Sequence, residues 1–203
     1  MLCLDTHQAP AVSTRLRRAP LFGAAGMVMC EGYSERVRLE VGDVVVYGAH
    51  GAGRIAAREQ RVVLGVAQET LVLDLAEGLS VTLPMERARE LLRPMLSAAD
   101  LRQVEKTLRE EHTPSELGWL QRSKDTQMKV AGGDPLGLAE VVRDGALRER
   151  KLIAKRTGSQ LSASERALYL KARRLLSGEI ALARGLDPEA ADAWIEKQLA
   201  ATA

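Results

Sequence analysis

The sequence predicts an α+β protein, with a small β barrel or rolled sheet first and an all-α part of five helices after it. Two observations predict this order. Short β-branched runs separated by glycines fill residues 37–96, and helix-start signals recur from Ser97 to the C-terminus. With 203 residues, the chain has the length of one or two ordinary domains. We therefore expect an N-terminal extension at 1–36, a β domain at 37–96 and a helical domain at 97–203.

The extension at 1–36 is expected to be disordered, as chain termini of this composition commonly are. Basic residues at 15–18 precede an apolar stretch, but they lie far from the N-terminus and no cleavage signal follows, so we do not interpret them as a secretion signal. Cys3 and Cys30 fit neither a zinc pattern nor a disulfide framework. This cysteine usage indicates a reducing, cytoplasmic location, and we expect no metal and no cofactor.

The β domain begins with the run Val41–Tyr47, which contains a turn at Gly42-Asp43. Further strands are expected at 61–64, 70–75 and 80–83, and Pro84 stops the last of them. Short strands at this close spacing, with glycine-rich turns between them, are typical of a small barrel or rolled sheet.

Each expected helix has its own start signal. These signals are Ser97, the capping boxes Thr113–Glu116 and Ser162–Glu165, and the pairs Asp134-Pro135 and Asp187-Pro188. A capping oxygen accepts a hydrogen bond from an N–H group that has no partner in the first turn, and proline has no N–H to leave unsatisfied. The expected helices are 97–111, 114–130, 135–155, 163–184 and 188–201.

Composition excludes several classes of protein. Hydrophobic residues make up 46% and charged residues 28%, which is normal for a globular protein and excludes a fully disordered chain. No run approaches the roughly 18 apolar residues that span a bilayer, so we expect no membrane association. The net charge of +2 excludes a uniformly basic nucleic-acid binder, but it does not exclude a local basic face.

The charge is unevenly distributed along the helical domain. Residues 143–174 contain ten Lys or Arg and three Asp or Glu, whereas residues 175–203 contain two and five. A basic segment of this kind can bind phosphates, although helix surfaces are routinely rich in Arg and Lys.

The expected helix at 114–130 places Trp119 in an unusual position. At about 100° per residue, one face holds four apolar residues and is the expected core face: Leu117, Leu120, Met128 and Ala131. Trp119 lies nearly opposite them, beside Arg122 and Lys129. Two interpretations stay open. Trp119 packs against a neighbouring element, or it is presented to wedge between bases, with Arg122 and Lys129 on phosphates.

A second class of function comes from the glycine loop. Gly48, Gly51 and Gly53 follow a β run, and Asp74 lies about twenty residues later, as in a nicotinamide-dependent oxidoreductase. However, a crossover helix needs about a dozen residues, and only 55–60 separate the loop from the next β run. A hairpin turn that uses glycine for positive φ is therefore favoured. We find no catalytic constellation and expect no enzyme activity.

Several motifs occur in the order found in one known family. They are Val41-Gly42-Asp43-x-Val45-Val46-Tyr47, Leu71-Val72-Leu73, Val81-x-Leu83-Pro84, Trp119, Leu138-Ala139-Glu140-Val141-Val142-Arg143-Asp144, Leu161-Ser162-x-x-Glu165-Arg166 and Lys171-Ala172-Arg173. Together they resemble the CarD/CdnL family of bacterial transcription regulators, over about residues 39–201.

The resemblance implies a Tudor-like β domain that binds the β subunit of RNA polymerase. Arg61 matches a polymerase-contacting basic position, and Thr82 falls where a relative has a polymerase-contacting arginine. Two further departures are Gly48, where the family usually has proline, and Gln121, where it has an arginine beside the tryptophan. The polymerase and DNA contacts are therefore expected to be weaker or differently distributed.

For the helical domain, the resemblance implies binding to promoter DNA at the upstream edge of the transcription bubble, mostly without reading sequence. Trp119 matches the family's wedge residue at the minor groove, Lys124 and Arg166 match basic DNA-contacting positions, and Arg122 lies in the same stretch. We expect the protein to be a monomer and to stabilise the open complex. The helical wheel places Lys124 near the apolar face, at odds with a phosphate contact. A repressor that reads a specific operator sequence is a second binding-class alternative.

Overall fold

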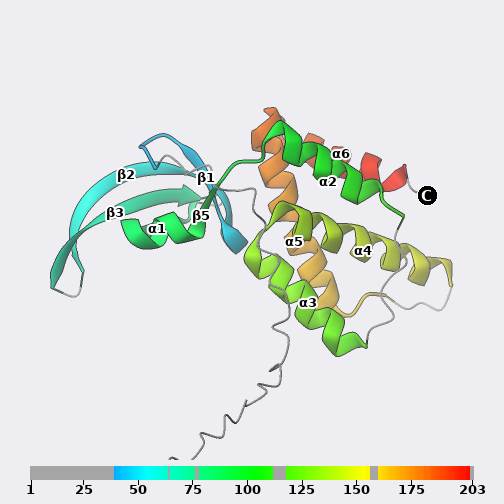
Figure 1. The fold of residues 1–203 in the computed structure, drawn as a ribbon. Helices are drawn as coiled ribbons and strands as arrows, with labels where there is room; N and C mark the ends of the chain where they lie inside the picture. The colour runs from blue at the N-terminus through cyan, green and yellow to red at the C-terminus, as the bar shows by residue number, and fades with distance from the viewer. Residues whose placement is uncertain (1–38, 64, 76–77, 112–117, 156–159, 202–203) are drawn as a thin grey trace, which may run out of the picture. The chain divides into compact units, whose positions relative to one another are not determined.

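The computed structural model describes residues 39–63, 65–75, 78–111, 118–155 and 160–201. They belong to one compact unit, residues 35–203. The expectations for residues 1–36, including those for Cys3 and Cys30, lie outside the described residues. The α+β class is confirmed, with a sheet followed in the chain by a group of helices (Figure 1).

Five strands form one antiparallel sheet. They are β1 (Val44–Tyr47), β2 (Gly51–Val63), β3 (Val66–Leu75), β4 (Ser80–Pro84) and β5 (Leu92–Pro94), in the spatial order β4-β3-β2-β1-β5. Among the described residues β4 and β5 are the two edges and do not pair with each other, so the sheet is open and the expected barrel closure is not found. Closure requires the outer strands to pair along their length, and here the chain between them forms a helix instead.

That helix, α1 (Met85–Leu91), was not expected from the sequence. Its Met85 and Ala88 are buried in one hydrophobic cluster with sheet residues such as Leu71 and Leu73. The segment therefore covers the apolar face of the sheet in place of a further strand. The strand pattern on either side hid this helix, because its 7 residues make only about two turns and are too few to show a clear 3.6-residue period.

The remaining helices are α2 (Ala98–Arg109), α3 (Trp119–Gly132), α4 (Pro135–Ala154), α5 (Ala163–Arg184) and α6 (Pro188–Ala200). Four expected starts are confirmed at the level of atoms. Ser97 and Ser162 form capping boxes, and the carboxylates of Asp134 and Asp187 accept hydrogen bonds from N–H groups of the first turn. Such caps are local, so sequence alone can locate them.

The helix expected at 114–130 corresponds to α3, and its expected capping box Thr113–Glu116 lies outside the described residues. In the described part of the chain Gly118 has an extended ψ of 153°, and α3 begins after it at Trp119. The tryptophan is consequently the first residue of its helix. Because Trp119 stands at the end of its helix, the rest of the domain leaves about half of its side chain exposed.

Buried apolar residues form two clusters. One runs from Leu39 to Leu92, between the sheet and α1, and the other runs from Leu96 to Leu199, among the helices. The boundaries 37–96 and 97–203 stay a prediction. The sheet cluster lies within the first segment, whereas the helical cluster begins at Leu96, the last residue of that segment.

The glycine loop is a hairpin turn. Gly48–His50 forms a short 3₁₀ turn, η1, and β1 pairs antiparallel with β2 directly after it. Gly48 and Gly51 have φ values of +35° and +87°, which a residue with a Cβ rarely adopts. A dinucleotide-binding turn requires a helix and a parallel strand at this point, so the oxidoreductase interpretation of this loop is wrong.

One guanidinium joins the sheet to the helices. Arg93, in β5, donates to both carboxylate oxygens of Glu179 in α5, with an Nη2–Oε2 distance of 2.6 Å. Its Nη2 also donates to the carbonyl oxygen of Gly133, at the C-terminal end of α3, at 2.7 Å. The Glu179 side chain is 2% exposed, and burial raises its pKa, while the hydrogen bonds from Arg93 act in the opposite direction.

Candidate nucleic-acid interface

The outward face of α3 is the one that the helical wheel assigned to the core. Leu120 is 60% exposed and Met128 is 66% exposed, whereas Val130, near the wheel position of Trp119, is buried. The expected core face was therefore wrong. The wheel assumes that apolar side chains point inward, but the inward side of α3 places polar side chains along a pocket with a mixed lining and only Val130 in the hydrophobic cluster.

This reversal removes the objection to Lys124. Because the face that holds Leu120 and Met128 points to solvent, Lys124 between them is exposed as well. An ammonium group on this face needs no snorkelling to reach a phosphate. The outward face of α3 thus combines a cation with two uncovered apolar side chains.

Trp119 is 52% exposed at the first residue of α3. The second tryptophan in the chain differs: Trp194 packs against the helical cluster, with the guanidinium of Arg184 5.2 Å from its ring centroid. A half-exposed indole at a helix start can contact a partner without any rearrangement of the core.

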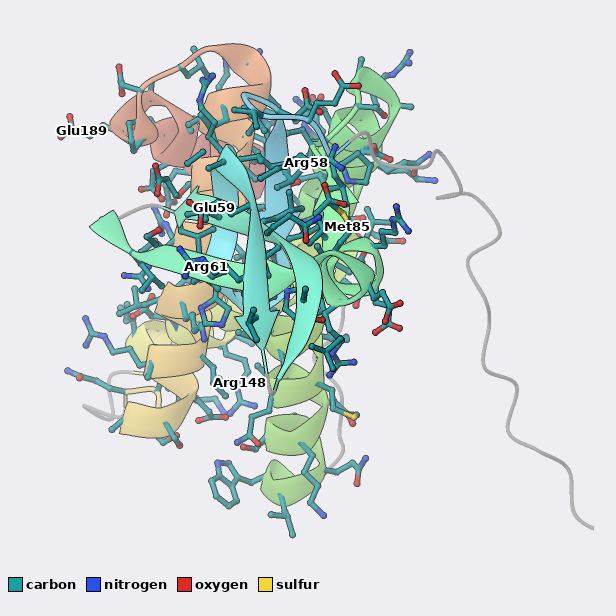
Figure 2. The ribbon with its side chains drawn as sticks, turned by 90° about the vertical axis from the view of Figure 1, so that its left-hand side faces the viewer. Arg58, Glu59, Arg61, Met85, Arg148 and Glu189 are labelled. Carbon is teal, nitrogen blue, oxygen red and sulfur yellow. The ribbon has the colours of Figure 1, made fainter. Side chains whose placement is uncertain are left out.

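The middle of α3, from Arg122 to Lys129, stands over a pocket of about 130 Å³ between α3, α4 and α5. Arg122, Asp125 and Lys129 line it from α3, while Arg148 and Glu165 line it from the other two helices. Arg122 therefore points inward, not toward solvent beside Trp119 as expected. Arg148, labelled in Figure 2, forms an ion pair with Glu165 at 3.2 Å.

The predicted basic residues fall into two groups. Lys129 forms an ion pair with Glu140 at 2.7 Å, and Arg122 lines the pocket. Arg166, in contrast, is exposed in the first turn of α5, next to the pocket residue Glu165. The fold thus brings the start of α5 to the same pocket as α3, although the 30 residues 133–162 lie between the two helices in the chain.

Some arginines of the basic segment at 143–174 form ion pairs within the protein and do not contribute to a basic surface. The guanidinium of Arg143 is buried and pairs with Asp144 at 3.0 Å and Glu110 at 3.1 Å. Arg173 pairs with Asp192 at 2.6 Å and with Glu196. The hydrogen bonds that Arg173 donates to Asp192 raise the pKa of its guanidinium above the usual value. Counting charges along the sequence could not separate these internal pairs from surface cations, because Glu110 follows α2 and the partners of Arg173 lie in α6.

The two predicted polymerase positions share one face of the sheet. Arg61 pairs with Gln68, and Thr82 pairs with Val72. Gln68 and Val72 are four residues apart on β3 and so point the same way, opposite to the buried Leu71. Both Arg61 and Thr82 are exposed, and Arg61 forms an ion pair with Glu59 at 2.7 Å, two residues away on β2 (Figure 2).

Two family descriptions match the chain, a CarD-like/TRCF RID domain at residues 39–96 and the CarD C-terminal domain at residues 103–196. The chain belongs to the CarD family. The first range contains the whole hydrophobic cluster of the sheet, and the second contains most of the cluster among the helices. Over 149 residues, the chain is also 28% identical to the Bacillus subtilis (strain 168) protein named "Putative transcription factor YdeB"; the match covers 72% of this chain and 93% of that protein.

The CarD assignment places the chain among transcription regulators and accounts for the order of the sequence motifs. In the part of the chain that the structure describes, no group of three His, Cys, Asp or Glu side chains could hold a metal ion. No helix formed by the described residues is both long and apolar enough to cross a bilayer.

Proposed function

We propose that this CarD-family regulator binds the β subunit of RNA polymerase through the sheet and promoter DNA through the helices, and that it stabilises the open complex. The observation that carries the proposal is the half-exposed Trp119 at the start of α3, next to an outward face with Lys124 at its centre. We assign polymerase binding to residues 37–96, as a Tudor-like module, and DNA binding to residues 97–203.

The proposed mechanism combines a tether with a wedge. Polymerase binding raises the effective concentration of the helices at one edge of the promoter bubble. Lys124 and Arg166 then contact phosphates, which position the protein without reading sequence. Gly118 has no side chain to cap α3, so N–H groups of its first turn can also donate to a phosphate.

Trp119 supplies the preference for the open state. An apolar wedge in the minor groove gains contacts where base stacking is already disrupted, as at the upstream fork of the bubble. A protein that binds the open state better than the closed state shifts the equilibrium toward opening. The action requires no catalytic step, metal or cofactor, and it takes place on polymerase, hence in the cytoplasm, with the regulator acting as a monomer.

Charge reversal in the sheet tests the polymerase contact. In a pull-down of bacterial RNA polymerase with the full chain, Arg61→Glu is expected to reduce capture at least fivefold, because it places a carboxylate at an exposed position of the binding face. Trp119→Ala serves as the control and should capture polymerase at the wild-type level. Equal capture by Arg61→Glu and wild type would contradict the assignment of this face.

The salt dependence of DNA binding tests the phosphate contacts. On forked promoter DNA, Lys124→Gln is expected to lower the slope of log affinity against log salt by about 1, because one released counterion is lost. Lys129→Gln is the matched control on the same helix, and a smaller change is expected because Glu140 already pairs with that lysine. Equal changes in the two variants would argue against Lys124 as a phosphate contact. Nanomolar, sequence-selective binding to duplex DNA without polymerase would favour the repressor alternative.

A further inference from the structure

The C-terminal end of helix α3 contacts the sheet. Its last residues contact the sheet hairpin, because the backbone of Gly133 lies against that of Gly48 in η1. A Cβ added at Gly133 would lie 2.5 Å from the carbonyl carbon and oxygen of Gly48. The middle of α3, from Arg122 to Lys129, lines the pocket that it shares with α4 and α5. The contact of α3 with the sheet hairpin is therefore made at its C-terminal end.

Arg93 holds that end. Its guanidinium donates to the carbonyl oxygen of Gly133 at 2.7 Å, and Glu179 orients the same guanidinium through two hydrogen bonds. Arg93 belongs to β5, which pairs with β1, the strand that leads into η1. The sheet thus grips the end of α3 through two adjacent contacts, a side chain from β5 and the backbone of η1.

We propose that Arg93 is a positioning residue that makes the orientation of α3, and hence the place of Trp119, follow that of the polymerase-binding sheet. The inference rests on the proposed function. Its physical basis is leverage: fourteen residues separate Trp119 from Gly133, which is about 21 Å of helix. A tilt of about 10° at the gripped end would therefore move Trp119 by about 4 Å, roughly the 3.4 Å spacing of stacked bases on one strand.

Two variants loosen the grip without touching the proposed contact residues. Arg93→Lys keeps the positive charge but removes the planar fork that reaches Glu179 and Gly133 together. Gly133→Ala places a methyl group against the Gly48 backbone at a φ of +66°. The matched control is Gly132→Ala, one residue earlier, where a Cβ meets nothing within 4 Å. If Arg93→Lys fails to fold, Gly133→Ala still tests the inference.

The first readout is the distance between spin labels on the sheet and on α3, measured in the full chain without polymerase. Labels at Glu86→Cys in α1 and Gln127→Cys in α3 are exposed, and Cys3→Ser and Cys30→Ser remove the two native thiols. We expect the distance distribution to shift or broaden by about 3 Å or more in Arg93→Lys and Gly133→Ala, but not in Gly132→Ala. Unchanged distributions in Arg93→Lys and Gly133→Ala would overturn the inference.

The second readout is the lifetime of the open promoter complex. Arg93→Lys and Gly133→Ala should shorten it severalfold, toward the value for Trp119→Ala, while polymerase capture stays at the wild-type level. Wild-type lifetimes in these variants, when Trp119→Ala does shorten the lifetime, would overturn the positioning role. If Trp119→Ala itself has no effect, the proposed function fails, and the spin-label distances still decide whether Arg93 orients α3.

Discussion

Replacing Trp119 with alanine is expected to shorten the lifetime of the open promoter complex by about 5- to 150-fold while polymerase capture stays unchanged. The range follows from the roughly 1–3 kcal/mol that an aromatic side chain contributes when it stacks on one base. The indole is 52% exposed at the start of α3, so its removal takes little from the hydrophobic core. The loss should therefore appear in promoter opening rather than in stability.

Two further variants sharpen this measurement. Trp119→Phe keeps a flat apolar ring and is expected to retain part of the effect. Trp194→Phe changes the other tryptophan, which packs in the helical cluster, and should leave the lifetime at the wild-type value. The lifetimes are measured by competitor challenge of preformed open complexes. A wild-type lifetime for Trp119→Ala would refute the wedge.

Replacing Glu179 with alanine is expected to lower the free energy of unfolding by about 3–5 kcal/mol. Removing one partner of a buried ion pair leaves the other charge in a poorly solvated position, and this penalty exceeds the net value of the pair itself. The Arg93 side chain is 20% exposed, and two of its hydrogen bonds end on Glu179. The measurement is urea unfolding at equilibrium, with linear extrapolation to water.

An exposed ion pair in the sheet provides the matched control. Arg58 and Glu69 are 2.5 Å apart, but both side chains are more than a third exposed. Glu69→Ala is therefore expected to cost about 0–1 kcal/mol, because solvent and salt screen such pairs. Similar losses in Glu179→Ala and Glu69→Ala would show that the link between sheet and helices is no stronger than a surface pair.

Local chemistry explains which features were predictable. The starts of α2, α4, α5 and α6 each depend on a side-chain oxygen within three residues of the N–H group that it caps. The hairpin at Gly48 and Gly51 depends on positive φ angles at those residues. Features that depend on a few neighbouring residues are written in a short stretch of sequence, and these expectations were confirmed.

Features that depend on distant partners were not predictable in this way. The helical wheel assigned the wrong face of α3 to the core, because the pocket between α3, α4 and α5 takes up polar side chains of α3 such as Arg122 and Asp125. The charge count treated Arg143 as part of a basic surface because its partner Glu110 lies in another part of the chain. Barrel closure failed as a prediction because the edge strands of the sheet do not meet.

The sequence by itself determined the α+β class, the helix starts and the family, because each depends on local patterns or on the order of motifs. Only the tertiary structure decided which side of α3 points outward and that Arg93 joins the end of α3 to Glu179. The physical reason is that burial and ion pairing are properties of side chains brought together by folding. The sequence shows Trp119, but it does not show that the opposite end of its helix contacts the sheet.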